Sequence, residues 1–128
     1  MTRRSASGVT AKTYLRGHVP AARRLDELEA LSLSVVSYFE LLQGLRNKAE
    51  MTALQKMLEK RSARLLPLTE AITQRAVGIM ESLVLSHGLQ MGDALIAATA
   101  IEHGLSVLTA NVKHFAAVPH LGLEPFTP

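Results

Sequence analysis

Residues 90–115 read QMGDALIAATAIEHGLSVLTANVKHF, and two patterns in this stretch together favour one fold class. The alanine-rich apolar run from Gln90 to His103 predicts a helix, which Gly104 ends. The apolar segment that follows, residues 105–109, predicts a buried strand. A helix that leads directly into a buried strand is typical of α/β proteins, in which right-handed crossovers build a parallel sheet.

The flanking sequence supplies further helices and strands in alternation. Additional strands are predicted at residues 33–36, 65–66 and 121–124. Additional helices are predicted at residues 20–31, 37–47, 51–61, 69–88 and 111–115. Thr69 is the expected N-cap of the long helix and Gly88 its end, while Ser37 and Glu40 have the spacing of a capping box.

Length and composition limit the class of protein. The chain has 128 residues, of which 48% are hydrophobic and 20% charged, as expected for one domain with its own core. It has no cysteine, which excludes a disulfide framework, a cysteine zinc site and a cysteine nucleophile. No apolar run approaches the roughly 18 residues that span a bilayer. We therefore expect no membrane association and a cytoplasmic location.

Positive charge is concentrated at the start of the sequence. Residues 1–24 carry six basic side chains and no acidic one, although the formal net charge of the chain is only +3. The remainder of the chain is therefore mildly acidic. A basic arm of this kind favours phosphate-bearing partners, and a solvated leader is the alternative interpretation.

Three polar residues are expected near the ends of predicted strands or at the start of a helix beside them: Glu40, Asp93 and Asn111. Because the carboxyl ends of parallel strands meet at one edge of a sheet, these side chains are predicted to converge there. Clustered oxygen ligands suit Mg²⁺ or Mn²⁺. Taken singly, each residue also has a simpler explanation as a helix-capping or helix-terminal residue.

Four segments resemble one family. They are Tyr14-Leu15-Arg16-Gly17, LSVVSYFELLQG at 33–44, GDALIAAT at 92–99 and VLTANVKHF at 107–115. In this order they resemble the PIN domain and, within that family, the VapC-type ribonuclease toxins of prokaryotic toxin–antitoxin pairs. The resemblance implies a three-layer α/β/α sandwich around a parallel sheet of four to five strands. It assigns residues 14–128 to the PIN-like domain and residues 1–13 to an atypical basic leader.

The resemblance also implies an activity and its residues. It implies an endoribonuclease that hydrolyses RNA with Mg²⁺ or Mn²⁺, in which Glu40 and Asp93 bind the metal and Asn111 completes the catalytic set. It further implies a cognate antitoxin and a homodimer. It also implies that Thr109 lines this site, where it is expected to contact RNA. Arg16 and Lys113 are expected to contact RNA because basic side chains can follow its phosphate backbone, with a solvated helix face as the alternative.

One element of the family pattern is missing. PIN domains begin with an apolar strand that ends in Asp-Thr-Asn or Asp-Thr-Ser, and counting back from Leu15 places that first Asp near Ser7. The sequence has no acidic residue before Asp26 and no apolar strand there. The abrupt return to the family pattern at Tyr14 suggests an altered start or reading frame upstream.

Three functions are therefore open. The first is an endoribonuclease toxin impaired by loss of the first metal-binding Asp. The second is a catalytically inactive PIN domain that binds antitoxin or dimerises. The third is a small α/β domain whose basic arm binds nucleic acid without a metal.

Overall fold

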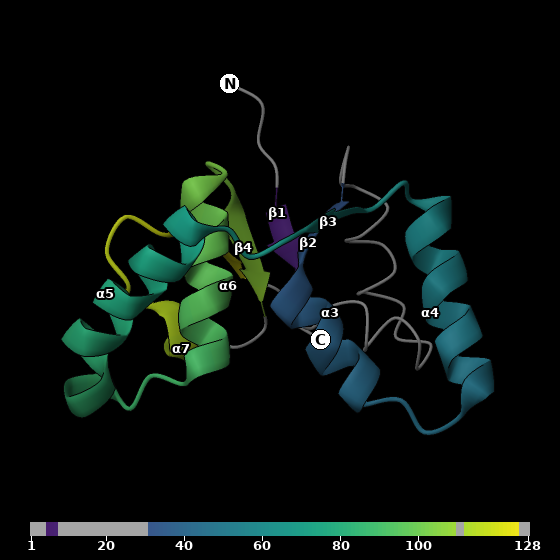
Figure 1. Cartoon of the computed structure of the whole chain (residues 1–128), viewed down its shortest axis with the longest axis horizontal. Helices are drawn as coiled ribbons and strands as arrows, with labels where there is room; N and C mark the ends of the chain where they lie inside the picture. Colours follow the sequence, from purple (N-terminus) through teal and green to yellow (C-terminus); the bar gives the residue numbers. More distant parts are fainter. Residues whose placement is uncertain (1–4, 8–30, 110–111, 126–128) are drawn as a thin grey trace.

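The computed structural model describes residues 5–7, 31–109 and 112–125 (Figure 1). The strands are β1 (Ser5–Ser7), β2 (Leu31–Ser34), β3 (Arg64–Leu66), β4 (Ser106–Thr109) and β5 (Gly122–Pro125). The helices of these residues are α3 (Val35–Gln43), α4 (Lys48–Lys60), α5 (Glu70–His87), α6 (Met91–Glu102) and α7 (Val112–Phe115). The helix predicted at 20–31 lies outside the described residues except for Leu31, which belongs to β2.

The five strands form one sheet in the order β3-β2-β1-β4-β5, and all neighbouring strands are parallel. Helices α5 and α6 lie on one side of the sheet and α4 on the other (Figure 1). This arrangement confirms the predicted α/β/α sandwich around a parallel sheet. β5 is an edge strand, as its sequence suggested.

β1 occupies the centre of the sheet. Ser5 pairs with Leu31 on β2 and with Ser106 on β4. The strand lies within residues 1–13, the segment that the sequence sets apart as a leader, and it consists of Ser-Ala-Ser rather than of apolar residues. Backbone hydrogen bonding to two neighbours is what joins this segment to the sheet.

The core has two parts, one with each layer of helices. One cluster of buried side chains joins β2 to α3 and α4 through Leu31, Leu33, Leu41, Leu54 and Met57. The larger cluster joins α5 and α6 to β4, and α6 supplies much of it because Ala94 and residues 96–98 are almost fully buried. The low polarity of α6 on all sides is typical of a helix enclosed by its neighbours.

Helix α3 begins two residues earlier than the sequence predicts. Ser34 is its N-cap, and the Ser34 Oγ accepts hydrogen bonds from the backbone N–H groups of Val36 and Ser37 at 3.0 and 3.5 Å. The strand predicted at 33–36 was therefore wrong in its second half, and the predicted Ser37–Glu40 capping box was also wrong. The β-branched pair Val35-Val36 favoured a strand locally, but the cap at Ser34 starts a helix there.

The boundaries of α5 were predicted correctly. The Thr69 Oγ1 accepts a hydrogen bond from the Ile72 N–H at 3.2 Å, and Gly88 ends the helix with a left-handed φ of 61°. A glycine tolerates this conformation because it has no Cβ. None of the helices in the described part of the chain is long and apolar enough to cross a membrane.

Candidate active site

The carboxylates of Glu40 on α3 and Asp93 on α6 lie close enough for the charge of Asp93 to act on Glu40. Both helices are close to the carboxyl-terminal edge of the sheet, because α3 continues directly from β2 and α6 contacts α3. Glu40 approaches the first turn of α6 so closely that a Cβ atom on Gly92 would lie 2.8 Å from Glu40 Oε2. The structure thus brings together two of the three residues predicted to form the catalytic set.

The environment of this pair disfavours two negative charges. Partial burial raises the pKa of the Glu40 carboxyl group, and the neighbouring charge of Asp93 raises that pKa further. Burial also raises the pKa of Asp93, whereas the imidazole of His114 lowers it. A cation placed between the carboxylates would offset both the burial and the repulsion.

His114 is the third side chain at this site. Its Nδ1 lies 3.6 Å from Asp93 Oδ2, with 57% of the His114 side chain and 18% of the Asp93 side chain exposed. From the sequence a surface histidine without a role was the favoured interpretation, although a position near the phosphate was also considered. The sequence places His114 shortly after the end of β4, but its approach to Asp93 comes from the packing of α7 against α6.

The remaining predicted residues are placed as follows. Asn111 and Arg16 lie outside the described residues, so their assignments stay predictions. Thr109 is buried at the carboxyl-terminal end of β4, with 1% of its surface exposed. Lys113 is exposed on α7, next to His114.

A cavity of about 430 Å³ borders Asp93. It lies between the end of α5, the start of α6 and α7, and Asp93, Lys113 and His114 form part of its wall. The other lining residues are Leu83, His87, Gly88, Leu89, Gln90 and Ala117. Asp93 therefore sits beside a space large enough for part of a ligand.

The donor set suits a hard cation with few protein ligands. Within residues 5–7, 31–109 and 112–125, no group of three or more His, Asp or Glu side chains is arranged to hold a metal ion. Glu40 and Asp93 nevertheless supply two carboxylates, and Mg²⁺ is commonly held by one or two carboxylates together with water and substrate phosphate. The described residues fit such a site.

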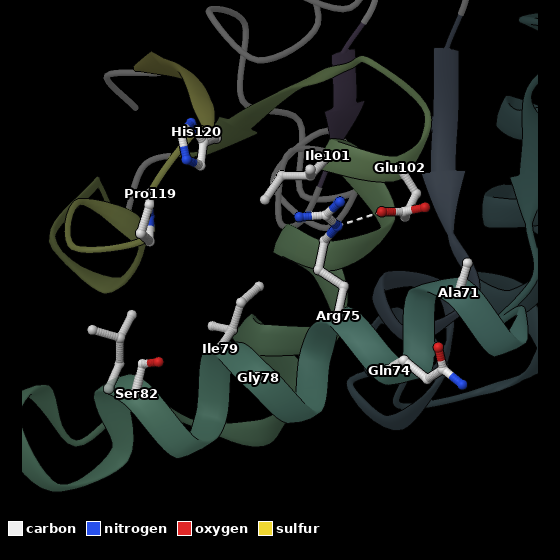
Figure 2. Close-up of a pocket in the computed structure, with 11 residues that line it drawn as sticks. Ala71, Gln74, Arg75, Gly78, Ile79, Ser82, Ile101, Glu102, Pro119 and His120 are labelled. Atoms are coloured by element: carbon white, nitrogen blue, oxygen red, sulfur yellow. Dashed lines mark hydrogen bonds and ion pairs between the residues drawn. The ribbon is translucent and has the colours of Figure 1, made fainter.

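A second cavity, of about 610 Å³, lies along most of the length of α5, from Ala71 to Leu83. Figure 2 shows Ile79 and Ser82 of α5 on one side of it, with Pro119 and His120 on the other. Arg75 points to Glu102 and forms an ion pair with it. Glu102, the acidic residue that lines this cavity among the described residues, is therefore paired with a guanidinium group and has no second carboxylate beside it in the cavity wall.

The chain is similar to known proteins over most of its length. A family model described as the PIN domain matches residues 14–121. Ribonuclease VapC10 of Mycobacterium tuberculosis is 43% identical over 106 residues, covering 80% of this chain and 77% of that protein. Ribonuclease VapC19 of the same organism is 37% identical over 116 residues, covering 87% of this chain and 90% of that protein.

A solved structure shows the same fold. The crystal structure of VapBC2 from Rickettsia felis, bound to a DNA fragment from their promoter, is similar with a TM-score of 0.80. The similarity covers 96% of this chain and 98% of that chain, at 20% identity. The fold, the match over residues 14–121 and the two close relatives lead to one conclusion. The chain belongs to the PIN-domain family and, within it, to the VapC type.

Proposed function

We propose that this chain is an endoribonuclease toxin of a type II toxin–antitoxin system, which hydrolyses RNA phosphodiester bonds with Mg²⁺ or Mn²⁺. The observation that carries the proposal is that the carboxylates of Glu40 on α3 and Asp93 on α6 lie close to each other. The similarity to Ribonuclease VapC10 and Ribonuclease VapC19 supports the same reaction class.

In this proposal Glu40 and Asp93 hold the metal ion. When bound, such an ion supplies Lewis-acid chemistry, by lowering the pKa of water and by offsetting charge on the phosphate. The protein itself positions the two carboxylates that would hold the ion. Asp93 is held in the first turn of α6, where the amino-terminal end of the helix favours an anion, and Gly92 leaves the room in which the Glu40 carboxylate lies.

The RNA and the antitoxin are the proposed partners. Lys113 and Thr109 are the described residues expected near the RNA, with Lys113 supplying a positive charge to a phosphate. A toxin–antitoxin complex from Klebsiella pneumoniae is also similar to this chain, with a TM-score of 0.73, which supports a cognate antitoxin for this chain. A homodimer also remains part of the proposal.

A specific observation favours a second candidate function. The family's first Asp is absent near Ser7, and the sequence has no acid before Asp26. Since losing even a residue that orients a metal ligand lowers metal affinity or activity by about 10–100-fold, the loss of a direct ligand is expected to lower them more. The second candidate is therefore an inactive PIN domain that binds antitoxin or dimerises.

RNA cleavage by the purified chain tests the proposal. The assay compares Mg²⁺ and Mn²⁺ with EDTA, and it includes Asp93→Asn. Cleavage that requires both a divalent ion and Asp93 supports the endoribonuclease. Absence of cleavage by a folded chain that binds its antitoxin supports the inactive domain instead.

A further inference from the structure

We propose that the cavity beside Asp93 is a nucleotide pocket that selects the RNA residue next to the bond that is cut. The proposal rests on the endoribonuclease function above and adds a specificity-determining site to it. The pocket, defined by its nine lining residues between α5, α6 and α7, has a volume of about 430 Å³. Pockets for small ligands have volumes of about 300–1,000 Å³.

The pocket has an apolar part that suits the face of a base. Leu83, Leu89 and Ala117 line it, and Leu89 is buried with 6% of its surface exposed. These side chains offer a hydrophobic surface for a planar ring without requiring an aromatic partner. An apolar lining with a few polar groups is the usual composition of a small-ligand pocket.

The same pocket carries hydrogen-bonding groups whose orientation is partly fixed. The Gln90 Nε2 donates to the Gly88 carbonyl oxygen at 3.5 Å, so the Gln90 carbonyl oxygen is available to accept from a base. The His87 Nδ1 is 2.7 Å from Ser86 Oγ, which leaves the Nε2 of the same ring for a ligand. Amide and imidazole groups can distinguish bases by their edges.

Charge distinguishes the end of the pocket near the reaction site. Lys113 and His114 line it on α7, and the Asp93 carboxylate borders it on α6. A phosphate can therefore lie between the positive Lys113 and a cation held by Asp93, while the attached base occupies the apolar part. This polarity fits a nucleotide better than it fits an apolar ligand or an isolated anion.

The position of Gln90 also makes it suitable for a test. Gln90 is the N-cap residue of α6, but its side chain makes no capping hydrogen bond. Its replacement by alanine should therefore remove the contact with a base and leave α6 in place. Lys113 is exposed on a four-residue helix, and Lys56, exposed on α4 across the sheet, is a matched control.

The first experiment measures binding to the full chain without any cleavage. Amide NMR spectra are recorded while the chain is titrated with each of the four nucleoside 5′-monophosphates and, separately, with inorganic phosphate. We expect at least one nucleotide to shift the resonances of Gly88, Gln90 and Ala117 more than phosphate does. Equal shifts from phosphate, or no shift from any nucleotide, would overturn the proposal.

The second experiment reads selectivity in the cleavage reaction by sequencing the cut ends of a mixed RNA pool. We expect Gln90→Ala to change the preferred nucleotide beside the cut. We expect Lys113→Ala to raise KM by about 2–5-fold with little change in kcat, and Lys56→Ala to alter neither. Cleavage with an unchanged preference in Gln90→Ala overturns the pocket but leaves the endoribonuclease intact. If no RNA is cut, the proposed function fails, and the NMR titration alone decides whether nucleotides bind here.

Discussion

The carboxylate of Glu40 occupies the space that a side chain on Gly92 would fill. A Cβ atom at position 92 would lie 2.8 Å from Glu40 Oε2, closer than such atoms approach in proteins. Glycine at 92 thus leaves room for the end of a flexible carboxylate side chain on another helix. It is not required by its own backbone, which has ordinary helical geometry in α6.

Gly92→Ala is therefore expected to separate activity from stability. The new methyl group would displace the end of the Glu40 side chain and lower activity, whereas α6 itself gains up to about 1 kcal/mol because alanine favours helices. Cleavage assays and thermal unfolding measure the two effects. Gly78→Ala on α5 is the matched control, since a Cβ there meets nothing within 4 Å. Equal activity of the two variants would contradict this account of Gly92.

Removal of either carboxylate should abolish the response to metal ions. Glu40→Gln and Asp93→Asn are expected to lower cleavage at least about 100-fold while leaving the fold intact. In the parent chain, Mg²⁺ at ten times its Kd should stabilise the fold by about 1.4 kcal/mol, because only the folded chain holds both ligands. Differential scanning calorimetry with and without EDTA checks this. Glu81→Gln, at an exposed position of α5, should respond like the parent.

The two raised pKa values predict how stability depends on pH in metal-free buffer. A carboxyl group whose pKa is raised by folding binds its proton more tightly in the folded state. Its contribution to stability is therefore present at low pH and is lost as the pH rises from the ordinary carboxyl pKa through the raised value. Urea unfolding measures this effect. Between about pH 4 and pH 7 the free energy of unfolding should fall more for the parent than for a Glu40→Gln/Asp93→Asn double variant. If the free energy of unfolding fell equally with pH in the two proteins, the pKa values of Glu40 and Asp93 would not be raised by folding.

The effect of the Asp93 charge on the pKa of Glu40 can be tested separately from the effect of burial. Asp93→Asn removes the negative neighbour but keeps the shape of the side chain, so the pKa of Glu40 should fall toward its ordinary value. It should not reach that value, because burial is the larger cause. Carbon-detected NMR titration of the Glu40 carboxyl group measures the change. An unchanged Glu40 pKa in this variant would mean that burial alone shifts it.

Two serines near the start of α3 should differ sharply when replaced by alanine. Ser34→Ala removes the cap of the helix that carries Glu40, and we expect a loss of about 1 kcal/mol in the free energy of unfolding. In contrast, Ser37 Oγ is buried without a hydrogen-bond partner among the described residues, so Ser37→Ala should be neutral or stabilising. Chemical denaturation of both variants compares them. If Ser37→Ala lowered the free energy of unfolding more than Ser34→Ala does, the capping box predicted from the sequence would be supported instead.

Much of this fold could be predicted because its signals are local. Thr69 and Gly88 bound α5 through capping chemistry, and the burial of α6 follows from its apolar composition. The start of α3 could not be predicted in this way, because Val35 and Val36 favour a strand by propensity while the Ser34 cap places them in a helix.

The site was predicted in part for a similar reason. Glu40 and Asp93 follow from the edge at which parallel strands end. The approach of Gly92 to Glu40 and the placement of His114 near Asp93 depend on how α3, α6 and α7 pack, which no spacing along the chain encodes. Asn111 and Arg16 lie outside the described residues, so their roles stay predictions.

The central position of β1 has a consequence for how the molecule folds. Ser5 pairs with Ser106, a residue that lies roughly a hundred positions further along the chain and is synthesised later. The β2–β3 half and the β4–β5 half of the sheet each adjoin β1 and not each other. Closing the sheet is therefore a long-range step that slows folding and leaves the edges of β1 and β2 open until β4 has been synthesised. A partner that captures the nascent chain would have that interval in which to act.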